Sequence, residues 1–378
     1  MLTTPERSSR LLTSEVMGRD GLVALLPQWN ELSKRSADDN VYYSPAYTMA
    51  LLDTVSARDK VRFLTVRDRA SLVAFLPFQT SLLRWPPFGE AGLAWQSPHT
   101  YTCAPLLGRE LAYEAADAIV TALMSMRPAT WMFPRMNIGG LAAAALATAF
   151  ERRLLKRRFI DPFKRAVVSH GLSFDEHLKK NIASKRRREL ARNRRRLSEL
   201  GRLRHQCVTG GSDLVKAVEA FLSIEASGWK GHGGTALQCQ PDSLAFARKA
   251  FTESSGCLAD VLLLDDKPIA VSLMVKSGRT GFTVKCAYDE TYRNFGAGLL
   301  LEEDALRNFL DNNFVDRLDS GTNGSHVIDG LWPESIEVGD LMLSVNPEAS
   351  DRAFDAVVQT ELLRRRAKDY LKRILRRD

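Results

Sequence analysis

The segment from 280 to 314 constrains the fold of this chain more than any other, because a strand, a glycine turn and a helix follow one another within it. The residue pattern favours a strand at 280–287 and a helix at 299–314. Between them lies the run Tyr292–Gly298, whose glycines permit a sharp turn that leaves backbone N–H groups uncovered. Those groups, the positive end of the following helix and Arg293 together favour an anion such as a diphosphate. The alternative is an ordinary strand-to-helix turn without a ligand.

Length and composition predict a globular protein of one large or two ordinary domains. The chain has 378 residues, of which 45% are apolar and 26% charged. The first 17 residues contain no apolar run fit for a signal peptide, and no window of 18 apolar residues predicts a membrane span. Five scattered cysteines without a Cys-x-x-Cys motif indicate reduced thiols, and the six histidines show no metal-binding spacing. We therefore expect a cytoplasmic protein without a metal.

The net charge of +8 is concentrated in two segments. Residues 179–204 contain twelve Lys or Arg against two Glu, and residues 364–377 contain eight against one Asp. The rest of the chain is acidic. Such local basicity predicts a negatively charged partner or substrate, which includes a phosphate, a nucleic acid and a membrane surface.

Strand and helix signals alternate along the chain, which predicts a mixed α/β fold. Two similar hairpins, at 61–79 and 259–275, indicate two copies of one fold with a boundary near 162–171. A Ser-x-x-Glu capping box at 173–176 begins a long basic helix, and the loop at 230–235 is expected to be mobile. In all, helices are predicted at 110–126, 141–158, 173–200, 212–229, 241–254 and 299–314. Besides the two hairpins, strands are predicted at 129–133, 164–169, 202–208, 280–287 and 315–319.

The spacing Arg-x-x-Gly-x-Gly at 293–298 resembles the coenzyme A pyrophosphate loop of the GNAT acyltransferase superfamily. From about 173 onward, the order of features resembles the CelD/BcsL-type acetyltransferases, a GNAT branch related to the FemABX peptidyltransferases. Many of these relatives have Ser-Pro-Gly at the loop and a Tyr-Lys pair before a late Trp. This chain has neither the Ser-Pro-Gly sequence nor the Tyr-Lys pair at these places. The matching features, in order, are the basic helix 184–201, Phe221, Glu225, Trp229, the Lys267–Ala270 turn, the Ala287–Arg293 run, the glycine loop and Leu318–Gly321.

This resemblance implies two tandem GNAT-like domains with mixed sheets. The first, 1–165, is degenerate, because no Arg-x-x-Gly-x-Gly follows its hairpin, and we expect it to bind no cofactor. The second, 166–345, contains the basic helix 174–200 and would bind acetyl-CoA or another acyl-CoA. Residues 346–378 form a basic amphipathic helix. The implied activity is N- or O-acyl transfer, above all acetyl transfer, to a sugar or a cell-envelope or exopolysaccharide precursor held between the halves.

The expected cofactor contacts combine the glycine loop with the strand that precedes it. The strand edge would hydrogen-bond the pantetheine arm and the thioester oxygen, and the loop would bind the diphosphate. These predicted cofactor-binding residues are Val284, Lys285, Cys286, Ala287, Arg293, Asn294, Phe295, Gly296, Ala297 and Gly298.

Acyl transfer also needs a base for the acceptor and an acid for the thiolate. Glu225 lies on an apolar helical face where burial would raise its pKa, and Asp289 directly follows the cofactor strand. Asp319 ends a strand, and His326 lies in a Gly- and Ser-rich loop. Tyr288 and Tyr292 are the candidate acids. Each has a structural alternative: a salt bridge for Glu225, a turn or cap for the two aspartates, solvent exposure for His326 and packing for the two tyrosines.

The basic segments leave the partner open. The long helix is either a solvated structural helix, a clamp for an anionic acceptor or cofactor phosphates, or a nucleic-acid contact. The C-terminal helix either docks on the protein or lies on an anionic membrane, which would suit a small or lipid-linked acceptor. Two other functions remain: an aminoacyl-tRNA-dependent peptidyltransferase, and a non-catalytic nucleic-acid-binding or scaffold protein on the same fold.

Overall fold

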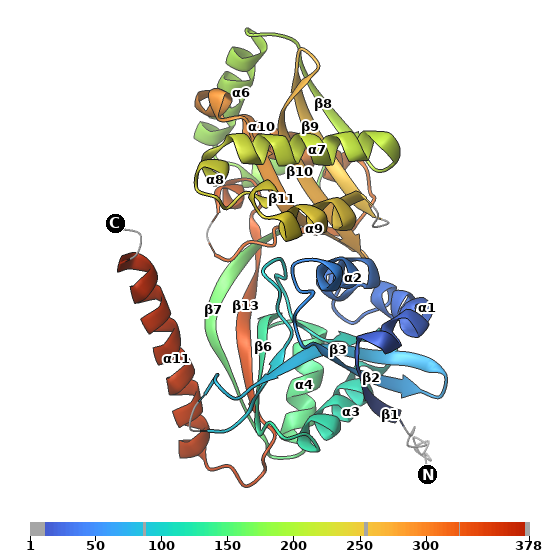
Figure 1. The fold of residues 1–378 in the computed structure, drawn as a ribbon. Helices are drawn as coiled ribbons and strands as arrows, with labels where there is room; N and C mark the ends of the chain where they lie inside the picture. The colour runs from blue at the N-terminus through green and yellow to red at the C-terminus, as the bar shows by residue number, and fades with distance from the viewer. Residues whose placement is uncertain (1–11, 86–87, 253–255, 325, 375–378) are drawn as a thin grey trace, which may run out of the picture.

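One mixed sheet runs through the molecule and joins two lobes (Figure 1). The computed structural model describes residues 12–374 apart from 86, 87, 253–255 and 325. Within these residues the sheet has 13 strands in the order β1-β2-β3-β4-β6-β13-β7-β12-β11-β10-β9-β8, with β5 paired to β3. The ends of the predicted N- and C-terminal segments, and of the helix predicted at 241–254, lie outside the described residues.

The two lobes repeat one pattern of strand pairing, which confirms the predicted tandem architecture. From each outer edge inward, three antiparallel pairs are followed by one parallel pair. The first lobe contributes β1 (Leu12–Met17), β2 (Arg62–Asp68), β3 (Ser71–Ser81), β4 (Ala91–Ala94), β5 (Leu106–Leu107) and β6 (Thr130–Asn137), and the second β8 (Leu203–Val208), β9 (Cys257–Leu264), β10 (Lys267–Ser277), β11 (Thr280–Tyr288) and β12 (Arg317–Asp319).

Two long central strands are exchanged between the lobes. β7 (Lys156–Ser169) follows the first lobe in sequence, yet its end pairs with β12 of the second. β13 (Glu334–Ser344) follows the second lobe, yet it pairs with β6 of the first. The two strands also pair with each other along most of their length, between the lobes (Figure 1). The boundary predicted at 165/166 therefore falls inside β7, and each lobe is completed by a strand from the other half of the chain.

Helices cover both faces of the second lobe's sheet. Phe221 of α7 packs with Val271 and Leu273 of β10 on one face, and Leu300 of α10 packs with Ile269 on the other. The helices are α1 (Leu22–Lys34), α2 (Pro45–Asp53), α3 (Ala112–Met124), α4 (Leu141–Glu151), α5 (Phe174–Asn181), α6 (Ser184–Ser198), α7 (Gly211–Ser227), α8 (Trp229–His232), α9 (Pro241–Thr252), α10 (Ala297–Asp311) and α11 (Asp351–Ile374), with short 3-10 helices η1 (Arg19–Gly21), η2 (Val41–Tyr43), η3 (Arg109–Leu111), η4 (Leu237–Cys239), η5 (Glu290–Phe295) and η6 (Val327–Gly330). No described helix has the length and apolarity needed to cross a bilayer.

Two predicted helices were wrong in extent. The helix predicted at 141–158 ends at Glu151, because the chain turns through Leu154 at a positive φ of 53° and enters β7 at Lys156. The helix predicted at 173–200 is two helices, since Ile182 is extended between α5 and α6. The capping box at its start is confirmed, with Ser173 accepting a hydrogen bond from the backbone N–H of Glu176. The predicted loop at 230–235 begins inside α8.

Candidate active site

The central opening of the second lobe lies where β11 and β12 separate. These parallel strands pair at Thr280, Gly281 and Phe282 of β11. On its other edge, β11 pairs with β10 from Thr280 to Tyr288. From Thr283 to Tyr288, no described strand pairs with the edge of β11 that faces β12. An extended ligand can therefore hydrogen-bond to this edge in the manner of an added strand.

The predicted anion loop lies at the surface at the end of β11. Gly296 has a left-handed φ of 66° and is the N-cap of α10, so a side chain there would be strained. Arg293 and Asn294 are exposed. Within the described part of the chain, the N–H groups of Ala297 and Gly298 make no backbone hydrogen bond. Ala297 is fully buried and Gly298 is partly exposed, so of these two free donors the N–H of Gly298 is the one that an anion could reach.

The basic helix α6 packs beside this loop. Its buried Leu190 and Leu197 face the core under α10, and Arg194 forms ion pairs of 2.7 and 2.8 Å with two carboxylates of α10, those of Glu303 and Asp304. The Arg196 guanidinium lies 5.0 Å from the Phe295 ring centre. Part of α6 is therefore structural. Sequence analysis did not single out Arg196, which is two residues after Arg194 and therefore on nearly the opposite side of the helix.

Glu225 and Tyr288 line one small cavity of about 50 Å³ next to the loop. Glu225 is buried, and its carboxylate accepts 2.9 Å hydrogen bonds from Lys230 Nζ and from the backbone N–H of Leu237. The Tyr288 ring packs against Gly298, where an added Cβ would lie 2.9 Å from its Cδ1 atom. The structure therefore brings the predicted base and the predicted cofactor loop to the two sides of Tyr288.

The first lobe adds a histidine that the sequence did not reveal. His99 is buried, stacks on Phe246 with ring centres 4.7 Å apart, and feels the charges of Lys285 and Glu225. Burial, and secondarily Lys285, lowers the pKa of His99 to about 4, so the ring is neutral at pH 7. Burial likewise lowers the pKa of Lys285, while Glu225 opposes that shift. His99 comes from a loop of the other lobe, so no local pattern could have linked it to Glu225.

Asp319 lies deeper, in a buried polar layer between the lobes. It accepts a 2.8 Å hydrogen bond from the N–H of Gly321 and lies 3.9 Å from Nη1 of the buried Arg165. The hydroxyl of Tyr42 is buried and has no hydrogen-bond partner among the described residues. Burial, and then the charge of Asp319, raises the pKa of Tyr42 well above its usual value. This buried layer between the lobes therefore contains the charged groups of Asp319 and Arg165 and the hydroxyl of Tyr42, which has no partner among the described residues.

The other two candidate bases are engaged in local caps. Asp289 accepts from the backbone N–H of Thr291 at 3.0 Å and caps η5. His326 is exposed and caps η6, its Nδ1 accepting from the N–H of Ile328 at 3.3 Å. Neither residue lines the cavity of Glu225. Among the described side chains, no group of three or more His, Cys, Asp and Glu has an arrangement that would hold a metal ion.

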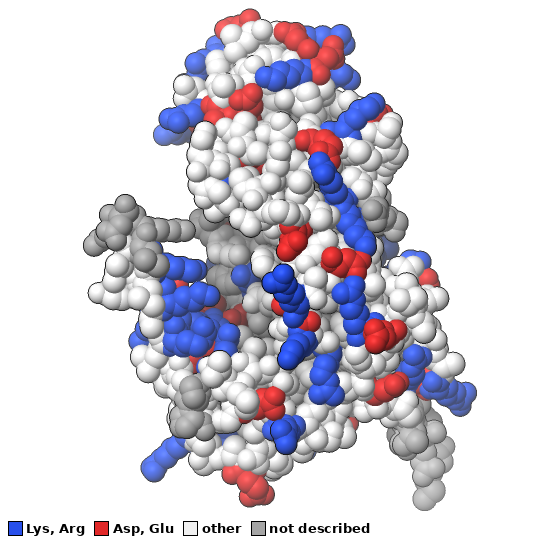
Figure 2. Space-filling view, in the orientation of Figure 1, with Lys and Arg blue, Asp and Glu red and all other residues white. Residues whose placement is uncertain are grey.

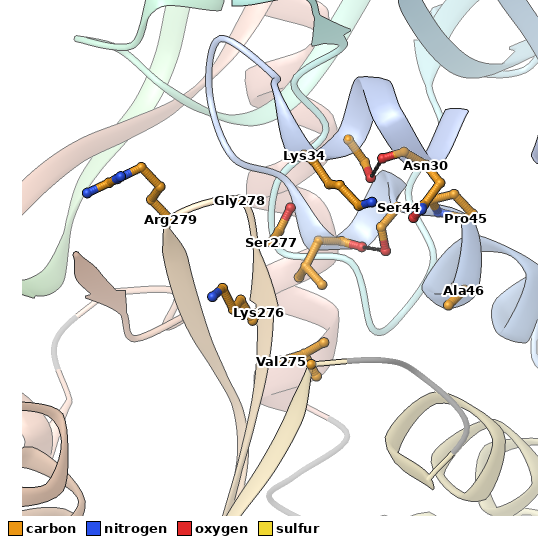
Figure 3. A pocket seen from close by; sticks show the side chains of 13 residues that line it. Asn30, Lys34, Ser44, Pro45, Ala46, Val275, Lys276, Ser277, Gly278 and Arg279 are labelled. Atoms are coloured by element: carbon orange, nitrogen blue, oxygen red, sulfur yellow. Dashed lines mark hydrogen bonds between the residues drawn. The ribbon is translucent and has the colours of Figure 1, made fainter. Parts of the chain in front are cut away.

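A wider cavity of about 480 Å³ lies at the opposite end of β10 and β11 (Figure 3). It separates the hairpin tip around Gly278 from α1 and α2, and its cations are engaged elsewhere. Lys34 pairs with Glu31, Lys276 donates to the carbonyl of Phe314, and Arg279 pairs with Asp316. None of the described residues that line it is Asp, Glu, His, Cys or Tyr, so we assign the acid–base chemistry to the smaller cavity.

Comparison with known proteins agrees with this geometry. Residues 184–326 match the model of the acetyltransferase (GNAT) domain family, which covers the basic helix, the cavity of Glu225 and the glycine loop. Over this range the second lobe is therefore similar to the GNAT acetyltransferase domain. A search of curated proteins found no significant sequence match.

Three solved structures share the fold over most of both chains. FemX superimposes with a TM-score of 0.56 and 9% identity, covering 87% of this chain and 96% of its own. The C-terminal domain of a protein assigned as a lysylphosphatidylglycerol synthetase from Agrobacterium fabrum gives 0.54 and 13%, with coverage of 90% and 96%. A protein of unknown function from Bacteroides thetaiotaomicron gives 0.53 and 10%, with coverage of 88% and 100%. At these identities the likeness concerns the fold alone.

Proposed function

We propose that this protein transfers an acyl group, in the first place acetyl, from coenzyme A to an amine or hydroxyl of a sugar or cell-envelope precursor. The observation that carries the proposal is the partly exposed glycine loop at the end of a strand that pairs with β12 only at Thr280–Phe282. The loop would bind the diphosphate with the N–H group of the partly exposed Gly298 and with the exposed Arg293. Arg196 lies close enough to the loop to add charge to the same site.

The edge of β11 would hold the rest of the cofactor. A pantetheine arm is peptide-like and would hydrogen-bond to the backbone between Val284 and Tyr288, which leads from the loop to Glu225. A backbone N–H of this strand would stabilise the thioester oxygen as it gains charge. The contact of Tyr288 with Gly298 favours a role in cofactor binding over protonation of the leaving thiolate.

Glu225 is our proposed base. Of the two carboxylates that line the cavity, Glu225 and Glu290, it is the buried one, and Lys230 holds it in place. The buried neutral ring of His99 and the partly buried Lys285 lie in its electrostatic field, so the acceptor proton would enter a water-poor site where its transfer is sensitive to these charges. The acceptor would approach from the interlobe layer that contains Asp319 and Arg165. The CelD/BcsL-type subclass and the anionic acceptor belong to the same proposal.

Glu225→Gln provides the sharpest test, because glutamine keeps the size of the side chain and its one amide oxygen can still accept from either Lys230 or the N–H of Leu237. We expect release of free CoA in the presence of a panel of amino sugars to fall at least about 100-fold. Binding of acetyl-CoA should stay unchanged. Full activity in this variant would refute the role of Glu225, and absence of any acetyl-CoA binding by the wild type would refute the proposed function.

A second candidate, an aminoacyl-tRNA-dependent transferase, is favoured by the exposed cations of α6 beside the loop. Arg188, Arg192 and Arg195 are exposed and have no ion pair among the described residues. A basic helix next to a transfer site would suit a polyanionic donor. Thermal stabilisation by acetyl-CoA but not by tRNA supports the first proposal, whereas stabilisation by tRNA alone, weakened by salt, supports the second. Stabilisation by neither favours a non-catalytic role.

A further inference from the structure

The C-terminal helix α11 has two apolar faces on opposite sides. The first packs on the first lobe: Phe354, Val357 and Val358 are buried against Trp85, Met132, Ile160 and Met342. The buried Glu361 continues this face and accepts hydrogen bonds from Arg84 and from Trp85 Nε1. One turn further on, Arg365 pairs with Asp161 and Asp340. Docking therefore accounts for the helix up to about this residue.

The second apolar face begins where docking ends. Its members are spaced i, i+4, i+7, i+8 and i+11, which places them in one stripe of a helix. By the same geometry, the stripe points away from the side that carries Val358, Glu361 and Arg365. All of its side chains are exposed: Leu363 (61%), Ala367, Tyr370 (65%), Leu371 (58%) and Ile374 (44%). This stripe has no partner among the described residues.

The surroundings of the stripe are basic. From 364 to 373 the sequence has six Lys or Arg and one acidic residue, Asp369. Arg366, Lys368 and Lys372 are exposed, and Figure 2 shows Lys and Arg side chains gathered beside the upper part of α11. Two copies of the helix meeting at the stripe would bring these rows of like charge together, which disfavours self-association. Apolar and aromatic side chains flanked by cations are instead complementary to an anionic lipid surface.

We infer that the last three turns of α11 bind the surface of an anionic membrane. Leu363, Tyr370, Leu371 and Ile374 would enter the interface between headgroups and acyl chains, while Arg366 and Lys368 would stay at the phosphate level. The first three turns would remain docked, so the helix would hold the lobes at the bilayer surface without crossing it. This inference does not depend on the proposed acyl transfer.

Vesicle co-sedimentation of the full chain tests the inference. Wild-type protein should sediment with vesicles of phosphatidylcholine and phosphatidylglycerol, and much less with phosphatidylcholine alone or at high salt. Leu371→Asp should lower the partition coefficient about tenfold, because it removes one inserted side chain and adds a negative charge. Leu200→Asp, two residues after α6, is the matched control, since Leu200 is similarly exposed (53%) and the charge change is the same.

Each other outcome overturns the inference. Absence of wild-type binding, or equal binding to both kinds of vesicle, would contradict an anionic membrane site. Equal loss in both variants would move the contact away from α11. Light scattering that shows a dimer which Leu371→Asp dissociates would assign the stripe to a second copy of the chain. Circular dichroism and the melting temperature of both variants verify that they fold.

Discussion

Replacing Glu302 by glutamine is expected to stabilise the protein above neutral pH. Glu302 projects from α10 towards the sheet, is buried, and accepts a 3.0 Å hydrogen bond from Ser272 Oγ. Burial is the largest influence on its carboxyl and raises the pKa from 4.5 to about 7, against smaller lowering effects of hydrogen bonds from Cys286 and Ser272. Near pH 7 the folded protein therefore holds a proton here that the unfolded chain has released.

The sign and size of the effect follow from this difference. Because the pKa is higher in the folded state, the stability linked to the proton is complete below pH 4.5 and is lost as the pH rises through about 7. The loss amounts to about 3 kcal/mol in all, most of it between about pH 5 and pH 8. Glutamine does not ionise, so the free energy of unfolding of the variant should not show this loss as the pH rises. Burial also raises the pKa of Asp260, so some dependence in the same direction remains.

Denaturant unfolding of wild type and Glu302→Gln at about pH 5 and pH 8 measures the effect. The difference in the free energy of unfolding between the two proteins should grow by about 2 to 3 kcal/mol towards the higher pH. Glu199→Gln, at an exposed carboxylate at the end of α6, is the control and should show no such growth. If Glu302→Gln differs from wild type by the same amount at both pH values, Glu302 is not protonated in the folded protein.

Three further predictions concern other buried groups and the cavity. Burial raises the pKa of Glu361, but a hydrogen bond from Arg364 and the charge of Arg84 outweigh burial and lower the pKa to about 2. Glu361→Gln should therefore lower the free energy of unfolding by about 3 kcal/mol at pH 7. This deficit should shrink as the pH falls below 4.5. A deficit that does not change with pH would contradict the ion-pair account. Since the pKa of His99 is lowered to about 4, the stability that its neutral ring contributes is present above pH 6.5 and falls by up to about 3 kcal/mol towards pH 4. In thermal unfolding, His99→Gln should lose less stability than wild type over this pH range. The same dependence of stability on pH in both proteins would refute the burial of His99. The cavity of about 50 Å³ is too small for a pantetheine arm, so binding of acetyl-CoA should displace the exposed side chain of Trp229, which lines it. The tryptophan fluorescence should change on binding in wild type and not in Trp229→Phe. The same fluorescence change in Trp229→Phe would refute the displacement.

Local signals in the sequence predicted most of the second lobe. The capping box at Ser173, the proline at the start of α9 and the glycines before α10 act within one or two turns, so the elements they bound could be placed without the fold. The glycine loop was also placed correctly at the junction of β11 and α10, because a left-handed residue at that point needs glycine.

Features that depend on distant pairing were missed. Residues 152–158 contain no helix breaker such as proline or glycine, and β7 begins there because its first residues, 156–158, pair with residues 342–344 of β13, far away in the sequence. The exchange of β7 and β13 likewise has no local signature, so the domain boundary was placed inside a strand. β13 itself, β1 and α1 were not predicted.

The candidate site shows the same limit. Glu225 was found because its helix has a clear apolar face, but its hydrogen bonds to Lys230 and Leu237 depend on how α8 and η4 fold back. His99 and Tyr42 come from irregular or short segments of the other lobe, and they face the second lobe through the strand exchange. Neighbours of this kind arise from tertiary packing, which the sequence pattern of either lobe does not encode.

Calorimetric titration of acetyl-CoA into two glycine variants tests the central claim, that the loop before α10 binds a diphosphate. Gly296→Trp and Gly211→Trp change glycines at helix N-termini with φ of 66° and 65°, so the backbone strain is matched and an added Cβ at Gly211 meets nothing within 4 Å. We predict binding to wild type and to Gly211→Trp, and none to Gly296→Trp. Undiminished binding to Gly296→Trp, or none to wild type, would contradict the account.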